Sequence, residues 1–80
     1  MLKELVGKAK QMRDTTGNHI DSCTTKIAWS LTNEQLAYLA QETGNKRFIT
    51  MAGLVCDDKD ARPLAISIAE GFIRKATREE

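Results

Sequence analysis

Residues 63–77 place apolar side chains around more than half of a predicted helix. On a helical wheel these side chains sweep about 200°, which is wider than a single core-facing stripe. They are Leu64, Ala65, Ile66, Ile68, Ala69, Phe72, Ile73 and Ala76. Because the chain has only 80 residues, few other elements can cover such an arc. We expect this helix either to be the central element, surrounded by the others, or to leave part of its face for a partner.

Two further segments have clear helical patterns. Residues 2–13 form an amphipathic stripe, and Gly17 offers a left-handed cap shortly after it. Residues 33–43 begin with the capping-box pair Thr32 and Gln35 and are followed by Gly44. Both segments are predicted to be helices.

Residues 19–31 and 46–56 fit two interpretations. In the first segment the helical pattern covers the whole stretch, with Asn18 as the expected N-cap, whereas a strand pattern covers only its second half. The second segment is almost continuously apolar, so its periodicity favours neither state. The predicted fold is a single small domain, residues 1–80, made of four to five short helices and mostly α. The alternative is an α+β fold with short strands near 24–31 and 47–55.

Composition narrows the classes of function. The net charge is +1, and 41% of the residues are hydrophobic, as in globular domains. Neither the basic excess of a dedicated nucleic-acid binder nor the strong acidity of a nucleic-acid mimic is present. Two cysteines, Cys23 and Cys56, are too few for a disulfide-rich secreted fold, so we expect a reducing, cytoplasmic environment. No apolar run is long enough to span a membrane, and no signal peptide is visible.

Residue patterns for catalysis and metal binding are weak. His19 and Cys23 are spaced i,i+4, but a zinc site needs at least one more protein ligand. Phosphate-binding, nucleotide-binding and serine-hydrolase motifs are all missing. We therefore expect no enzymatic activity, no cofactor and no metal.

The wide apolar arc instead predicts a small regulatory or adaptor protein that binds proteins through its helix faces. The expected partners are a second copy of the chain, giving a homodimer, and other proteins. Trp29 and Tyr38 point away from the inner faces of their predicted helices, and exposed aromatics often anchor interfaces. The predicted interface residues are Trp29, Tyr38, Ile66, Phe72 and Ile73.

An alternative function is a small dimeric DNA-binding regulator. Residues 32–55 have the outline of a helix-turn-helix, in which the second helix would enter the major groove of a palindromic site. Asn45, Lys46 and Arg47 would then contact phosphate or base edges. The nearly neutral charge of the chain argues against strong attraction to phosphate.

Overall fold

The computed structural model describes residues 1–79 and shows a bundle of α-helices. The helices are α1 (Leu2–Thr16), α2 (Ile20–Trp29), α3 (Asn33–Thr43), α4 (Lys46–Leu54) and α5 (Ala61–Glu79). Within residues 1–79 there is no strand, so the mostly α prediction is confirmed and the α+β alternative is wrong.

The ends of α1 and α3 follow from local sequence. The Thr32 side chain accepts from the backbone N–H of Gln35, and the Gln35 side chain accepts from the N–H of Thr32, which completes the predicted capping box. Gly17 and Gly44 take left-handed φ values of 74° and 69°, and their N–H groups donate to carbonyls of the preceding turn. The first helix continues to Thr16, three residues further than predicted.

Residues 20–29 are helical, and the cap differs from the prediction. The N-cap is His19, not Asn18, and His19 Nδ1 accepts from the backbone N–H of Asp21 at 3.2 Å. Cys23, Thr24, Ile27 and Ala28 are buried, which is the spacing of one helix face. The strand pattern would have turned Trp29 inward, but Trp29 is 53% exposed.

The fourth helix begins at Lys46 and ends at Leu54, two residues before the predicted end. The Asn45 side chain caps its first turn by accepting from the backbone N–H of Phe48 at 3.0 Å. Phe48 and Ala52 are buried one turn apart, while Gly53 faces solvent. A nearly all-apolar stretch is therefore compatible with a short helix that buries only one side.

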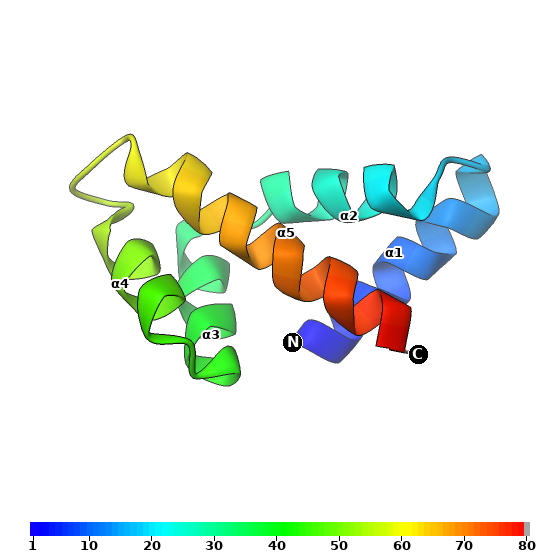
Figure 1. The fold of residues 1–80 in the computed structure, drawn as a ribbon. Helices are drawn as coiled ribbons and strands as arrows, with labels where there is room; N and C mark the ends of the chain where they lie inside the picture. The colour runs from blue at the N-terminus through cyan, green and yellow to red at the C-terminus, as the bar shows by residue number, and fades with distance from the viewer. Residues whose placement is uncertain (80) are drawn as a thin grey trace.

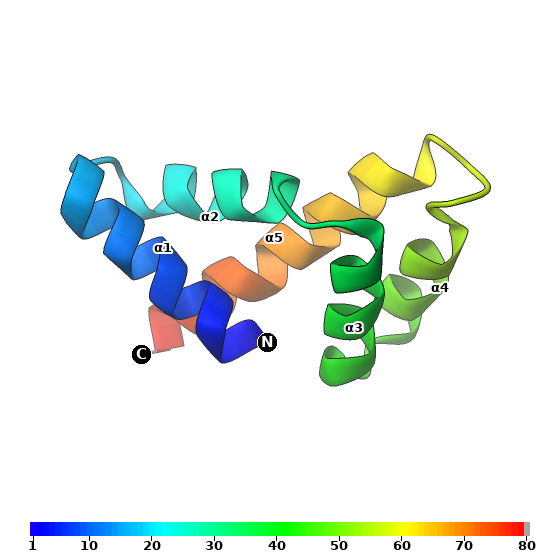
Figure 2. The same ribbon diagram turned by 180° about the vertical axis from the view of Figure 1, so that it is seen from behind.

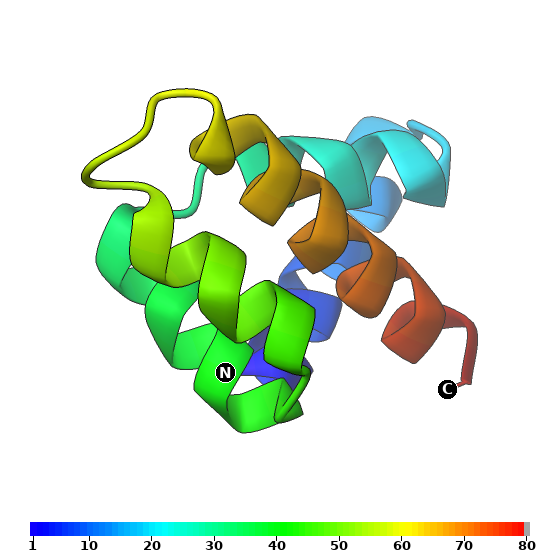
Figure 3. The same ribbon diagram turned by 60° about the vertical axis from the view of Figure 1, so that its left-hand side comes forward.

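Helix α5 packs against each of the other four helices. Figures 1 and 2 show α1 and α2 at one end of the molecule and α3 and α4 at the other, with α5 running across both pairs. Figure 3 shows α4 running back alongside α3 after the short turn at Gly44. Helix α5 is therefore the central element that holds the two helix pairs together, although they do not surround it completely.

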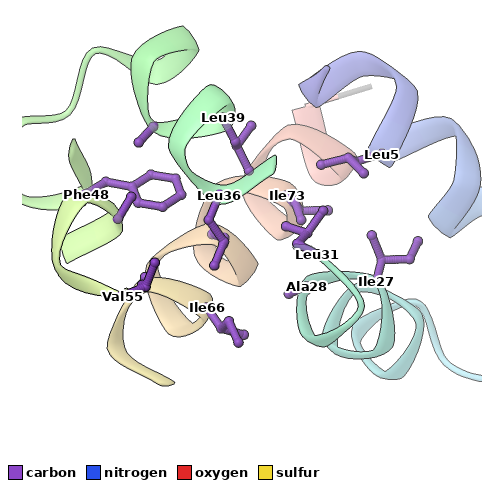
Figure 4. Close-up of a cluster of buried hydrophobic side chains, with 14 of the residues drawn as sticks. Leu5, Ile27, Ala28, Leu31, Leu36, Leu39, Phe48, Val55, Ile66 and Ile73 are labelled. Atoms are coloured by element: carbon purple, nitrogen blue, oxygen red, sulfur yellow. The ribbon is translucent and has the colours of Figure 1, made fainter. Parts of the chain in front are cut away.

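The core forms where α5 meets these pairs. Side chains from all five helices converge there, including Leu5, Ile27, Leu31, Leu36, Leu39, Phe48, Ile66 and Ile73 (Figure 4). Burying a leucine- or phenylalanine-sized side chain contributes about 1.5–3 kcal/mol relative to leaving it exposed. Because these side chains are buried, only the opposite faces of the helices are open to a partner.

Candidate protein-interaction surfaces

The apolar arc of α5 divides into an inner half and an outer half. Ala65, Ile66, Ala69 and Ile73 lie in the core, each with 3% of its surface exposed or less. Ile66 and Ile73 are fully buried, so they are unavailable to a partner docking on this fold, and their assignment as interface residues is corrected. The helical wheel predicts the extent of the apolar arc, but it does not predict which part of the arc packs against α1 to α4.

The outer half is a row of side chains one turn apart along α5. It consists of Leu64, Ile68, Phe72 and Ala76, and none of them is fully buried. Leu64 is the most open, at 50% exposed. The ring of Phe72 stacks on Phe48 with centroids 5.8 Å apart, so Phe72 is shared between the α4–α5 contact and the surface.

Two small residues lie beside this row. Ser67 and Gly71 are exposed and are spaced four apart. A Cβ added at Gly71 would meet no atom within 4 Å, so nothing in the chain requires glycine there. We define the α5 outer surface as Leu64, Ser67, Ile68, Gly71 and Phe72. Figure 1 shows α5 crossing the front of the molecule with no helix before it.

A polar cluster fixes α2 beside α5. Arg74 forms an ion pair with Glu70 in its own helix and another with Asp21 of α2, at 3.3 Å. Its guanidinium group also donates to the hydroxyls of Thr24 and Thr25, at 3.3 and 3.1 Å. The Glu70–Arg74 pair has the i,i+4 spacing of neighbours on one helix, whereas the contacts of Arg74 with α2 have no such local signal.

The same contacts fix the direction in which α2 runs along α5. The two helices run antiparallel, since Asp21 contacts Arg78 near one end and Arg62 donates to the Leu31 carbonyl near the other, at 2.7 Å. Trp29 therefore lies close to the level of Ser67 along α5. Its indole is half exposed, and Trp29 stays a predicted interface residue.

Tyr38 occupies a different surface, on α3. It is 62% exposed and lies between two shallow hollows of about 360 and 580 Å³. Both hollows are lined by Tyr38 and Glu34, which are one turn apart. The first hollow also includes Met1, Glu4 and Gln35, and the second includes Ala37, Gln41 and Glu42. We call this set of residues the Tyr38 surface.

The carboxyl groups of the Tyr38 surface differ in their partners. The N-terminal ammonium group of Met1 pairs with Glu42 at 3.0 Å, and the backbone N–H of Leu2 donates to the same carboxylate at 3.1 Å. These two donors lower the pKa of Glu42 below its ordinary value of 4.5. Within residues 1–79, no cation pairs with Glu4 or Glu34. Helical spacing alone places Glu34 and Glu42 on the same side of α3 as Tyr38, whereas the approach of Glu4 from α1 has no local sequence signal.

The predicted DNA-contacting residues lie together at the start of α4. Lys46 and Arg47 are exposed, and the Asn45 side chain is engaged as the helix cap. Helices α3 and α4 run back alongside each other in Figures 1 and 3, whereas a helix-turn-helix crosses at about 90–120°. The outline is therefore present in the sequence, but the arrangement differs from that motif.

The remaining polar residues have structural surroundings. His19 caps α2, Cys23 is buried, and Cys56 is an exposed free thiol. Among the described residues, no three His, Cys, Asp or Glu side chains gather closely enough to hold a metal ion. In the same part of the chain, no helix has both the length and the apolar content needed to cross a bilayer.

Comparison with protein-family models, with curated proteins and with solved structures finds no match to this chain.

Proposed function

We propose that this chain is a small, non-enzymatic regulatory or adaptor protein that acts by protein–protein binding, and that one of its partners is a second copy of itself. The observation that carries the proposal is the uncovered α5 outer surface, with Leu64 half exposed beside Ile68 and Phe72. We assign it to a reducing, cytoplasmic environment, with which its two free cysteines are compatible.

The α5 outer surface suits a twofold contact between two copies. In such a dimer the same surface faces itself, so the Ser67 and Gly71 of one copy approach those of the other. Small residues allow two helices to come close together, and the flanking Leu64 side chains then pack against the partner helix. The open space around Gly71 is consistent with an approach by another molecule.

The area that a stable dimer interface buries indicates which other helices must contribute to it. A stable interface buries about 800 Å² on each partner, and the accessible surface of this chain is 5061 Å². About a sixth of the whole surface would therefore be covered. One helix face is too small for this, so the proposed interface extends from α5 onto Trp29 of α2.

Sedimentation velocity over a concentration series, from micromolar to millimolar, tests the proposal. We expect a reversible monomer–dimer equilibrium in the wild-type chain. Leu64→Lys should raise the dimer dissociation constant at least about tenfold, because each half-exposed leucine loses about 1 kcal/mol or more of apolar burial and the lysines of the two copies repel each other.

A matched pair of glycine variants supplies the control. Gly71→Gln should block the close approach, while Gly7→Gln on α1 should leave the dimer intact. A Cβ at either glycine meets no atom within 4 Å, so both variants are expected to fold. A wild-type chain that stays monomeric up to millimolar concentration, or equal effects of the two glycine variants, would overturn the proposal.

A second candidate function, DNA binding, is favoured by the exposure of Lys46 and Arg47 in one helix turn. An electrophoretic mobility shift on duplex DNA across a salt series measures it. If phosphate contacts matter, affinity falls steeply with salt, and Lys46→Ala combined with Arg47→Ala weakens binding to all sequences similarly. A lack of any shift at low salt would exclude this function.

A further inference from the structure

We propose that the Tyr38 surface binds an arginine-containing segment of a partner protein, with a guanidinium group placed over the Tyr38 ring and paired with Glu34. This inference rests on the proposed protein-binding role, but it concerns a surface on α3 and not the α5 outer surface. It names the chemistry that this second surface recognises.

The first step is the position of the ring. Tyr38 is the most exposed of the large hydrophobic side chains in the described structure, at 62%. It lies between the two hollows, with Glu34 one turn before it on the same side of α3. A planar cation can therefore lie against the ring while its N–H groups reach the Glu34 carboxylate.

The second step is the charge of the surroundings. Helix α3 has no basic residue, and the hollows add Glu4 from α1 to Glu34 and Glu42 from α3. The Glu42 carboxylate is occupied by the N-terminal ammonium group. Within residues 1–79, Glu4 and Glu34 form no ion pair, so two carboxylates beside an aromatic ring are open to a cation from a partner.

The third step is the kind of cation. The acidic groups of residues 1–79 do not gather in the threes that a metal ion needs, and here they are spread over two separate hollows. A protein side chain fits this spacing better than a single ion. Arginine fits best, because its guanidinium group stacks on aromatic faces and donates to a carboxylate through two N–H groups at once.

The arrangement of the hollows also predicts the form of the segment. Glu34 and Tyr38 line both hollows, so together they separate one hollow from the other. An extended segment crossing this ridge can place one basic side chain on each side. One arginine would lie over Tyr38 and pair with Glu34, with its stem passing Gln41 in the second hollow, and the other would approach Glu4 in the first hollow.

An NMR titration of the ¹⁵N-labelled full chain tests the inference. The probe is a terminally blocked hexapeptide with two arginines separated by two glycines, and the same peptide with glutamates in place of the arginines is the comparison. We expect the arginine peptide to shift the amide signals of Glu4, Glu34, Tyr38 and Gln41, and the glutamate peptide to shift none of them.

Substitutions on the Tyr38 surface test which side chains contact the arginine peptide. Tyr38→Ala and Glu34→Gln should each raise the dissociation constant about two- to fivefold, as expected for an exposed cation–π contact and an exposed ion pair. Tyr38→Phe keeps the ring and should retain binding. Asp57→Asn removes one negative charge from the exposed 56–60 loop and should leave the dissociation constant unchanged. The amide spectrum of each variant verifies its fold.

Three results would overturn the inference: no shift with the arginine peptide, shifts spread evenly over all acidic residues, or equal weakening by Asp57→Asn and Glu34→Gln. Its failure can be distinguished from that of the proposed self-association. Leu64→Lys should weaken the dimer and leave peptide binding unchanged, whereas Tyr38→Ala should weaken peptide binding and leave the dimer unchanged.

Discussion

At the scale of single residues, the outward direction of two aromatics could be predicted from helical spacing, but the burial of individual apolar residues could not. Trp29 and Tyr38 are both more than half exposed, as their positions on the wheel indicated. Ile66 and Ile73 are fully buried, because α5 is enclosed on the side where they lie. A wheel gives relative directions on one helix, whereas burial depends on neighbours that are distant in the sequence.

Glu42 provides a prediction that depends on pH. Its pKa is lowered in the folded chain by the N-terminal ammonium group and by the Leu2 N–H. The pair therefore stabilises the fold at pH values above 4.5 and ceases to do so as the pH falls below 4.5 through the lower folded pKa. Because the pair is solvent-exposed, we expect Glu42→Gln to lower the free energy of unfolding by only about 0.2–1 kcal/mol at pH 7.

Urea unfolding of the wild-type chain and of Glu42→Gln at several pH values measures this effect. The difference between the two should shrink toward zero on acidification, while Asp57→Asn serves as the exposed-carboxyl control. A difference that stays constant from neutral to acidic pH would show that the ion pair does not contribute.

At the scale of helices, boundaries were predictable where the cap is encoded in nearby side chains. The Thr32 and Gln35 box and the two left-handed glycines set the limits of α3 and the end of α1. The N-terminus of α2 was misplaced by one residue because histidine is an uncommon N-cap, and its ring nitrogen takes the place that the Asn18 side chain was expected to fill. Contacts between helices, such as those of Arg74, have no local sequence signal.

Arg74 gives a prediction about the packing of α2 on α5. Arg74→Met keeps an apolar stem but removes the charge. It leaves Glu70, whose side chain is only 20% exposed, without its ion-pair partner and with the Thr25 hydroxyl as its donor at 3.0 Å. We expect a loss of about 1–3 kcal/mol in the free energy of unfolding, because a partly buried carboxylate is left without a compensating positive charge. This corresponds to a fall in Tm of several degrees.

Thermal and urea unfolding of Arg74→Met, Glu70→Gln and the double variant make the double-mutant cycle. The double variant should lose less than the sum of the single losses, since both remove the same cluster. Additive losses would mean that Arg74 and Glu70 act independently. The matched change Arg13→Met, in an exposed pair with Asp14, should have little effect.

At the scale of the whole molecule, the helical class and the number of helices followed from sequence patterns, but the arrangement did not. The sequence left open whether α5 would be enclosed or would expose part of its arc, and the structure combines the two outcomes. Four of the eight apolar residues in the arc are in the core, and the row from Leu64 to Ala76 borders solvent. The Tyr38 surface also depends on tertiary structure, because it requires the N-terminal turn of α1 to lie beside α3.

The position of α5 in the chain has a consequence for biosynthesis. The α1–α2 pair and the α3–α4 pair both pack on a helix that begins only at Ala61. While the earlier residues emerge from a ribosome, each pair has its apolar side uncovered, a state in which chains are prone to aggregate. Native packing of these helices must therefore wait until α5 has been synthesised and has left the exit tunnel.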